Sequence, residues 1–565
     1  MYRVPWLLAG WFCVLASAFA EPPAAILQRA LDELQPSSLS RAEQQAELEW
    51  FIAAARPLQG LQIRVIAERI ATHEYEAFVL APLFSELTGI RVIHEISGED
   101  DVVNKLRAQQ RTGLPLYDAF ISDSDLLGQH FRDGQVLALT DFMAGQGAAF
   151  TLPSLALDDF IGLPFVTAPD GKLYQLPDQQ FANLYWYRQD WFERAELRQA
   201  FQERYGYALD VPQNWSAYAD IAEFFSEQVR ELDGRRVYGH MDYGAYDPSL
   251  GWRLSDAWLG MAGVADVGLP NGVPVDDWGL RVEGCRPAGA SMQRGGALDS
   301  PAAVYALRQY IDWLQRFAPP EARQMNFNQA GSVAAQGQIA QQIFWYTAFT
   351  GDYTRPGSPV VDEQGLPRWR VAPSPRGAYW REGMKSGYQD VGAWTLLKGS
   401  EPARQQAAWL YAQFVVSRSV SLRKTLVGLT PIRRSDLDSP AMQAAAPRLG
   451  GLVEFYRSAA ARRWTPTGAN VPDYSGMASL WWRYLYPALD GRQSAQQALQ
   501  ALAGAFDEHL ARLSGSQAHA CAPRLNSRSD PQHWLRQPGA PWPALADEQP
   551  AGRTLPYAEA LHAWD

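Results

Sequence analysis

The sequence predicts an α/β protein built from two lobes, and three observations support this prediction. Short apolar strands alternate with amphipathic helices over residues 61–122, which is typical of a mainly parallel sheet covered on both faces. Residues 173–192 hold a dense aromatic run that we interpret as the passage from the first lobe into the second. The length of 565 residues, with 47% hydrophobic content, is enough to bury more than one core.

The N-terminus has the parts of a secretory signal peptide. Arg3 supplies the positive charge, residues 4–19 form an apolar run, and small residues mark a cleavage position after Ala20. The apolar run is short for a transmembrane helix. We therefore expect residues 1–20 to be removed and the mature protein to be released into the periplasm.

Residues 21–56 predict a helical N-terminal extension, in which Ser40 and Glu43 form a capping box before the second helix. The elements that follow are, in order, strand 61–67, helix 74–88, strand 90–96, helix 101–112 and strand 117–122. Gly89 and Gly113 are placed to end the two helices.

Polar residues stand where two of these strands end. Glu68 and His73 follow the first strand, and Ser122 and Asp123 stand at the end of the third. Ligands of such sheets bind beyond the carboxyl ends of the strands. We therefore expect these four side chains to lie near a ligand.

The passage between the lobes is predicted as a strand at 173–177, a polar stretch at 178–183 and an aromatic strand at 184–187. Asp178 opens the polar stretch, which we expect to lie nearest the ligand. Tyr185 shares one face of the aromatic strand with Tyr187, and the residue between them faces the other way. The sequence leaves open which face looks into the cleft.

The rest of the chain continues in the same style. Asn214 is the predicted N-cap of a helix. The later elements are a Gly/Pro-rich insertion at 262–300, helix 301–317, strand 341–347, strand 387–397, helix 401–416, a linker at 429–433, helices 477–486 and 494–513, and a polar, Pro-rich tail.

Cysteine usage favours one disulfide. Cys13 lies in the signal peptide, which leaves Cys285 and Cys521 in the mature chain. An oxidising compartment makes a bridge between them the natural expectation. Two free, buried thiols are the alternative.

The composition excludes several classes of function. The net charge is −11 and no long basic run is present, so we expect no nucleic-acid partner. The sequence carries no HExxH, GxSxG or P-loop motif, and its histidines lack metal-ligand spacing. We therefore assign no catalytic residue, no metal and no cofactor.

Aromatic residues are abundant, with 21 Trp, 24 Tyr and 23 Phe. Flat rings pack against the C–H faces of sugars and polyols, and carboxylates accept hydrogen bonds from their hydroxyl groups. Trp252, Trp345, Tyr346 and Trp394 stand at predicted strand ends or loops. Each ring alone is explained as well by core packing, so the set carries the interpretation.

Four segments in order suggest a family. They are GKLYQLP at 171–177 with LYWY at 184–187, VPQNW at 211–215, GAW at 392–394 with KGS at 398–400, and GLTPIR at 428–433. Over roughly residues 60–515 the chain resembles the family 1 extracellular solute-binding proteins of bacterial ABC importers. Trp186 and Tyr187 depart from the Tyr-Asn that is commoner in this family.

The resemblance implies the two-lobed periplasmic-binding-protein fold of type II, with a hinge between the lobes and extensions at both ends. Lobe one would comprise residues 57–170 and 385–430, lobe two residues 171–384 and 431–515, and the tail residues 516–565. The chain would act as a monomer that captures a small polyol or sugar and delivers it to a permease in the inner membrane. Its length and aromatic character are similar to those of the members associated with glycerol, which favours glycerol. The complete candidate ligand-binding set is Glu68, His73, Ser122, Asp123, Asp178, Tyr185, Trp252, Trp345, Tyr346, Asp390 and Trp394.

Three alternatives stay open. A phosphorylated polyol such as glycerol phosphate would need a cation in the cleft, for which Arg69 and Arg253 are candidates. A secreted carbohydrate-active enzyme would need a paired acid and base. A ligand sensor that signals to a membrane receptor uses the same fold.

Overall fold

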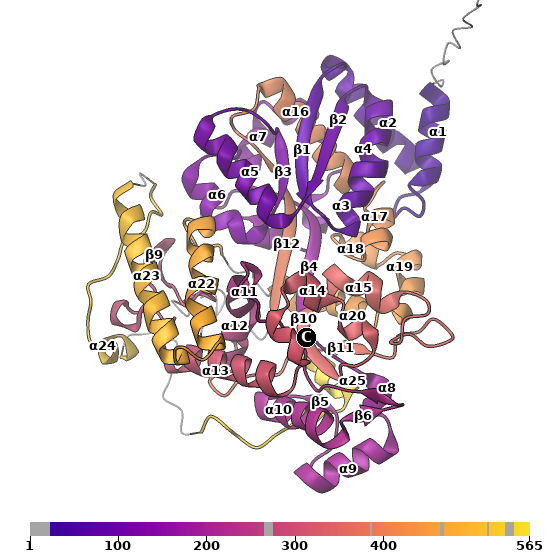
Figure 1. The fold of residues 1–565 in the computed structure, drawn as a ribbon. Helices are drawn as coiled ribbons and strands as arrows, with labels where there is room; N and C mark the ends of the chain where they lie inside the picture. Colours follow the sequence, from indigo (N-terminus) through magenta and orange to yellow (C-terminus); the bar gives the residue numbers. More distant parts are fainter. Residues whose placement is uncertain (1–22, 265–274, 385–386, 464–467, 517–518, 537–546) are drawn as a thin grey trace, which may run out of the picture.

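The computed structural model describes residues 23–264, 275–384, 387–463, 468–516, 519–536 and 547–565. The predicted signal peptide lies outside these residues. A seven-stranded sheet runs through the described chain in the order β10-β4-β12-β3-β1-β2, with β11 beside β4. Its strands are β1 (Gln62–Glu68), β2 (Arg91–Ser97), β3 (Ala119–Asp123), β4 (Leu176–Tyr187), β10 (Gln341–Trp345), β11 (Arg370–Ala372) and β12 (Tyr388–Leu396). In Figure 1, β4 and β12 run from the upper part of the molecule into the lower part.

We call lobe one the part built around β1, β2 and β3, which pair in parallel as predicted. Its helices are α3 (Ala71–Tyr75), α4 (Ala81–Thr88), α5 (Glu99–Thr112), α6 (Leu127–Asp133), α7 (Leu139–Ala144), α16 (Pro402–Val416) and α17 (Ser421–Gly428). The predicted helix 74–88 corresponds to α3 and α4, which a π-helical turn joins without a break. Gly89 and Gly113 end their helices at φ angles of 74° and 68°, in the left-handed region that favours glycine.

The N-terminal extension is part of the core of lobe one. It forms α1 (Pro23–Glu33) and α2 (Arg41–Ala55), and the capping box of Ser40 and Glu43 is confirmed. The ring of Phe51 meets that of Phe414 in α16 edge to face, with centroids 5.5 Å apart. The extension therefore covers apolar surface that lobe one would otherwise expose.

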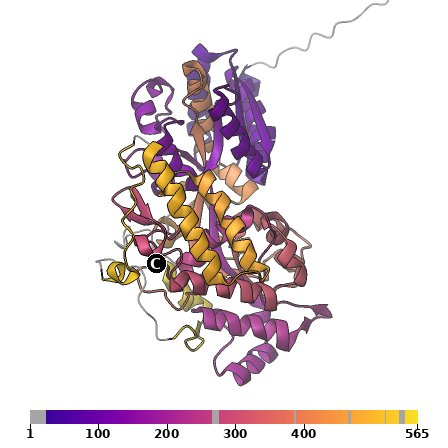
Figure 2. The same cartoon turned by 60° about the vertical axis from the view of Figure 1, so that its left-hand side comes forward.

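We call lobe two the part built around β10 and β11, which occupies the lower half of the molecule in Figure 1. Asn214 caps α10, because its side chain accepts a hydrogen bond from Ala217 N at 3.0 Å. Figure 2 shows α22 and α23 lying side by side on the flank of this lobe. The helices are α8 (Gln189–Phe192), α9 (Ala195–Tyr205), α10 (Trp215–Glu223), α11 (Ser249–Arg253), α12 (Leu259–Ala262), α13 (Pro301–Arg316), α14 (Phe327–Gly331), α15 (Tyr346–Thr354), α18 (Arg434–Leu437), α19 (Pro440–Ala445), α20 (Leu452–Arg457), α21 (Ala460–Arg463), α22 (Tyr474–Leu489) and α23 (Ala495–Ser516).

The C-terminal tail wraps lobe two and adds short elements to it. These are α24 (Pro531–Leu535), β13 (Thr554–Leu555), which pairs with β5 (Val211–Pro212), and α25 (Tyr557–Ala560). The ring of Trp564 packs edge to face against Phe455 at 5.2 Å. No helix in the described part of the chain combines the length and apolar character needed to cross a membrane.

The insertion at 262–300 was predicted as a long loop, but its described residues include a hairpin. Strands β8 (Arg281–Glu283) and β9 (Arg286–Gly289) pair antiparallel, and Cys285 lies in the turn between them. A second short hairpin joins β6 (Glu231–Leu232) to β7 (Arg235–Arg236). The predicted disulfide is present between Cys285 and Cys521, with the two Cα atoms 5.1 Å apart, and it ties the tail to the hairpin.

The passage between the lobes differs from its prediction. Residues 176–187 form one continuous buried strand, β4, instead of two short strands around a polar stretch. β10 pairs along one edge of β4, and β12 and β11 pair one after the other along the opposite edge. Polar side chains are tolerated inside because they bond to one another, as Gln180 donates to Gln389 Oε1 at 2.6 Å. Strand 341–347 also ends early, since helix α15 begins at Tyr346.

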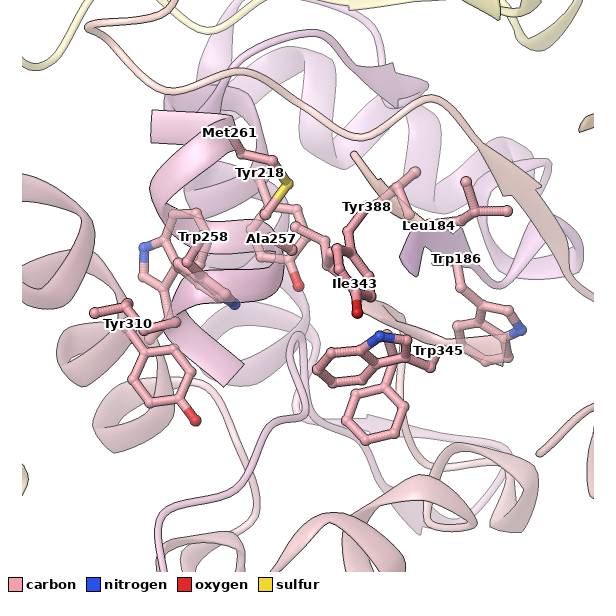
Figure 3. Packing of buried hydrophobic residues seen from close by; sticks show 14 of the residues in the cluster. Leu184, Trp186, Tyr218, Ala257, Trp258, Met261, Tyr310, Ile343, Trp345 and Tyr388 are labelled. Atoms are coloured by element: carbon pink, nitrogen blue, oxygen red, sulfur yellow. The ribbon is translucent and has the colours of Figure 1, made fainter. Parts of the chain in front are cut away.

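Most tryptophans of the core pack against other aromatic rings. Figure 3 shows Trp258 against Tyr310, with ring centroids 5.0 Å apart, and Trp345 near Tyr388. In β4, Trp186 faces Trp369 and Tyr353, at centroid distances of 6.3 and 5.8 Å. Core packing therefore accounts for much of the high tryptophan content.

Replacing Trp186 with alanine should leave a large cavity at the centre of lobe two. We expect the free energy of unfolding to fall by about 3–5 kcal/mol, as for other fully buried aromatic residues. Denaturant unfolding followed by circular dichroism measures this loss. Trp482→Ala removes the same side chain from a half-buried position on α22 and should cost clearly less; equal losses would contradict the packing described.

Candidate ligand-binding cleft

A cleft of about 460 Å³ lies between the two lobes. Lobe one supplies residues that follow the carboxyl ends of its strands, where ligands of parallel sheets bind. Lobe two supplies most of the aromatic lining. The residues that line the cleft are Glu68, Arg69, Ile70, Gly98, Asp123, Asp125, Phe181, Trp252, Asp256, Phe327, Asn328, Trp345, Phe349, Tyr388, Asp390 and Tyr474.

Five carboxyl groups line the cleft, but only one of the lining residues is a cation. The acids are Glu68, Asp123, Asp125, Asp256 and Asp390, and the cation is Arg69. The guanidinium of Arg69 is largely exposed and already donates to Glu74 at 2.7 Å. The cleft therefore presents mainly hydrogen-bond acceptors and negative charge to a ligand.

Asp390 is held rigidly at the base of the cleft. Its Oδ1 accepts hydrogen bonds from the backbone N–H of Ser124 at 3.1 Å and from that of Val391 at 2.7 Å, and also from the Ser124 hydroxyl. Burial raises the pKa of Asp390 above its ordinary value, although these hydrogen bonds oppose the rise.

Burial also raises the pKa of Glu68, and repulsion from Asp390 raises it further. A hydrogen bond from Gln179 at 3.5 Å offsets only a part of this rise. The two acids therefore oppose each other's ionisation, and a ligand that donates hydrogen bonds to them would relieve that repulsion.

Asp125 connects the lobes across the cleft. Its two carboxylate oxygens accept hydrogen bonds from the hydroxyl of Tyr388 at 3.3 Å and from that of Tyr474 at 3.2 Å. Asp125 lies at the start of the segment that leads into α6 of lobe one, whereas Tyr474 opens α22 of lobe two. These hydrogen bonds hold the lobes together at the edge of the cleft.

An aromatic wall closes the side of the cleft formed by lobe two. The ring centroid of Trp252 lies 5.1 Å from that of Phe327 and 5.4 Å from that of Trp345, and each pair meets edge to face. Arg253 stands behind this wall, 4.9 Å from the centroid of Trp345, and pairs with Asp242 at 2.7 Å. A buried, bidentate ion pair with Asp242 thus holds Arg253 in place against the rings of the wall.

The structure brings together five of the eleven residues that the sequence nominated. Glu68, Asp123, Trp252, Trp345 and Asp390 line the cleft. Tyr346 begins α15, and its side chain lies outside what the structure describes. The remaining five, which are His73, Ser122, Asp178, Tyr185 and Trp394, lie outside the cleft lining.

These five are buried where they support the strands. Ser122 hydrogen-bonds with Thr395 at 2.9 Å, and Tyr185 donates to Gln341 at 2.9 Å. Trp394 donates to Asp178 at 3.0 Å. His73 and Ser122 were chosen because they stand at strand ends, a position that does not specify which side of the sheet a side chain faces.

A buried group of charges lies beneath the cleft. Lys424 donates to Asp178 at 2.5 Å and to Glu76 at 2.7 Å, and all three side chains are buried. Burial favours the uncharged forms, but Lys424 holds the pKa of Asp178 below its ordinary value. Burial raises the pKa of Glu76 well above its ordinary value, and repulsion from Asp178 adds to the rise.

His73 completes this group and connects it to the cleft. Burial lowers the pKa of His73 to about 4, so the ring is neutral at neutral pH. Its Nδ1 donates to the backbone carbonyl of Glu68 at 2.8 Å, and its Nε2 lies 3.7 Å from Asp178. The group therefore joins α3, the shared strand β4 and α17 directly below the Glu68 carboxyl group.

Several lining residues were missed by the sequence reasoning. Asp125 follows Asp123 by two positions, a signal that could have indicated a second acid at the same strand end. Asp256 and Tyr474 lie in helices far apart in sequence, and only the fold brings them together. In the described ranges, no group of three or more His, Cys, Asp or Glu residues is arranged to hold a metal ion.

Comparison with known proteins agrees with this architecture. A family model described as bacterial extracellular solute-binding protein matches residues 80–448, so the chain belongs to that family. The fold is that of the two-lobed periplasmic binding proteins.

Three solved structures illustrate the likeness. An ABC-transporter solute-binding protein of Agrobacterium radiobacter K84, in complex with ribitol, has a TM-score of 0.61 and 19% identity, covering 80% of this chain and 100% of that one. Maltose-bound MalE3 of T. maritima has a TM-score of 0.59 and 18% identity, and the match covers 80% of this chain and 100% of MalE3. An ABC-transporter solute-binding protein of Agrobacterium vitis S4 with bound D-mannitol has a TM-score of 0.57 and 16% identity, and the match covers 81% of this chain and 100% of that one.

Replacing Lys424 with methionine should strongly destabilise the protein. The change leaves Glu76 and Asp178 buried without their cation, which typically costs about 3–5 kcal/mol. Urea unfolding of the two proteins measures the loss. Lys398→Met makes the same change at an exposed site and should shift the free energy of unfolding by less than about 0.5 kcal/mol. A Lys424 variant as stable as its control would contradict the charge group described.

The acids of the cleft should make stability depend on pH. The folded protein keeps its proton on Glu68 up to about pH 7, whereas the unfolded chain loses it near 4.5. The folded state therefore binds more protons between these values, so the free energy of unfolding falls as pH rises through this window.

Thermal unfolding of the wild type and of Glu68→Gln from pH 4 to pH 8 tests this dependence. The variant should lose less stability over the window, because its amide does not ionise. Glu203→Gln, on the exposed surface, should follow the wild type. Parallel curves for the wild type and Glu68→Gln would show that the Glu68 proton is not linked to folding.

Proposed function

We propose that this protein is the substrate-binding component of an ABC importer, which captures a small polyol or sugar between its lobes and delivers it to a membrane permease. The observation that carries the proposal is the cleft, whose lining combines five carboxyl groups with a wall of aromatic rings. Membership of the extracellular solute-binding family supports the transport role. We expect the protein to act as a monomer in the periplasm.

The cleft lining offers both apolar and polar contacts, which match the C–H groups and the hydroxyl groups of a polyol. The rings of Trp252 and Trp345 offer flat, apolar surfaces to C–H groups, and the carboxylates accept hydrogen bonds from hydroxyl groups. Similar structures were solved with ribitol, D-mannitol, alpha-D-tagatose and maltose. We infer a ligand of the same chemical class.

Among small polyols and sugars, glycerol is the ligand that the resemblance favours. The cleft of about 460 Å³ falls in the usual range for small-molecule sites and has room for larger polyols and sugars as well. A binding panel should therefore run from glycerol through pentitols and hexitols to disaccharides.

A phosphorylated polyol is less compatible with the charge of the cleft. Arg69 lies on the lining but is paired with Glu74. Arg253 is buried behind the aromatic wall and pairs with Asp242, so it does not reach a ligand. The ionised carboxylates of the cleft lining would repel a phosphate, which favours a neutral ligand.

Closure follows from the arrangement of the shared strands. A ligand that touches acids of lobe one and rings of lobe two stabilises the conformation in which both are close. The permease would then recognise the closed form. A glycosidase remains the contrasting hypothesis, because Glu68 and Asp390 have raised pKa values, and turnover of a glycoside would establish it.

Isothermal titration with the panel of polyols and sugars tests the proposal. At least one member should bind, whereas glycerol phosphate should bind more weakly than glycerol. Asp123→Asn and Trp252→Ala should each weaken the best ligand about tenfold or more, because each removes a direct contact. Asp158→Asn and Trp482→Ala change the same residue types outside the cleft and should bind normally. Failure of every neutral polyol and sugar to bind would refute the proposal.

A further inference from the structure

Helix α6 of lobe one reaches the disulfide of lobe two through one arginine. The side chain of Arg132 is buried, with 6% exposure. Its Nε donates to the backbone carbonyl of Cys521 at 3.0 Å, and its Nη2 donates to that of Cys285 at 2.8 Å. One guanidinium therefore hydrogen-bonds to the backbone of both cysteines of the disulfide.

The other hydrogen bonds of Arg132 complete the contact. Its Nη1 donates to the carbonyl of Gly128 at 2.5 Å and to that of Ala469 at 3.4 Å. Within the described chain, all hydrogen bonds of this guanidinium go to carbonyl oxygens. The geometry of the two hydrogen bonds to Cys285 and Cys521 depends on the backbone at these residues, which the disulfide links. The planar fork of arginine suits such a fixed set of acceptors, and lysine does not reproduce it.

The packing around Arg132 is equally close. A Cβ atom on Gly128 would lie 2.3 Å from the carbonyl oxygen of Gly468 and 2.6 Å from that of Val471, so only glycine fits between these segments. The ring of Phe131 packs edge to face against His519 in the tail, with centroids 5.5 Å apart. Phe131 also shares an apolar cluster with Cys521.

This contact stands next to the cleft. Asp123 and Asp125, which line the cleft, directly precede α6, and Tyr474, which hydrogen-bonds with Asp125, directly follows the segment that packs on Gly128. A shift of α6 against the disulfide would therefore move two ligand-facing acids relative to the wall formed by lobe two.

We propose that Arg132 and the Cys285–Cys521 disulfide form a second joint between the lobes, which positions α6 and thereby sets the affinity for the ligand. The shared strands β4 and β12 form the first joint. The second joint exists only while the lobes are in contact, so losing it favours the open form and weakens binding. Reduction of the disulfide should also favour the open form and weaken binding, because the carbonyls that accept hydrogen bonds from Arg132 are then no longer held together. The link to affinity rests on the proposed function, but the joint itself does not.

Small-angle scattering of the ligand-free protein tests the joint without any ligand. Arg132→Ala and the double variant Cys285→Ser/Cys521→Ser should each increase the radius of gyration, and so should reduction of the wild type with dithiothreitol. Arg132→Lys keeps the charge and one hydrogen bond, so its change should be intermediate. Arg236→Ala removes an arginine that donates to carbonyls within lobe two and should leave the radius unchanged.

Titration with glycerol and ribitol then tests the link to affinity. Arg132→Ala should bind the better of the two about tenfold more weakly than the wild type, since hydrogen bonds from a buried charged group are lost. When Arg132→Ala is added to the Cys285→Ser/Cys521→Ser variant, affinity should fall little further, because both changes break the same joint. Fully additive losses would refute a shared joint, and so would a lowered melting temperature with unchanged radius and affinity. If neither polyol binds while the radius still increases, the proposed ligand class fails and the joint stands.

Discussion

The antiparallel pairing of β4 with β12 is the constraint on which the rest of the structure depends. Both strands are buried along their whole length and run through both lobes. A buried strand must satisfy its backbone groups on both edges and its polar side chains on both faces. β4 meets this demand with β10 on one edge and with β12 and β11 on the other. The lobes are therefore linked by hydrogen-bonded backbone, with little freedom to slide past each other.

The cleft inherits its chemistry from this arrangement. Asp390 lies on β12, and its carboxylate is oriented by the backbone N–H of Val391 on the same strand and by that of Ser124 in the segment leading to α6. Glu68 ends β1, and the charge group of Lys424, Asp178 and Glu76 lies beneath it. Excess negative charge in a confined space is costly unless protons, hydrogen bonds or a ligand relieve it. Burial raises the pKa of both Glu68 and Asp390, and repulsion from Asp390 raises that of Glu68 further, so protons offset a part of this cost.

Much of the fold could be predicted from the sequence, because local signals and tertiary demands agree there. Gly89 and Gly113 end helices, Asn214 caps one, and Cys285 pairs with Cys521. The β/α rhythm indicated a parallel sheet, and the resemblance to a family indicated two lobes. These features depend on residues close in sequence or on a single possible pairing.

The continuous strand β4 could not be predicted, because its polar residues are satisfied by partners distant in sequence. Gln180 bonds to Gln389, and Asp178 bonds to Lys424, more than two hundred residues away in each case. The same reason explains the candidate site. Strand-end position identified Glu68 and Asp123, but His73 and Ser122 face supporting layers instead of the cleft. Burial of a polar side chain is decided by its partners, and those partners are visible only in the fold.

Two of the connections between the lobes, the strand pair and the α6 contact, would respond differently to the proposed opening and closing. β4 and β12 permit bending, since a twisted pair of strands can flex without breaking its hydrogen bonds. The contact between α6 and the disulfide permits far less, because Arg132 donates to carbonyls at defined positions and Gly128 has no room to move inward. In the proposed mechanism, opening breaks this contact, and the ligand supplies less of the free energy of closure while the contact is intact. The proposal of a second joint therefore makes the preference for closure a property of the oxidised chain, set before any ligand binds.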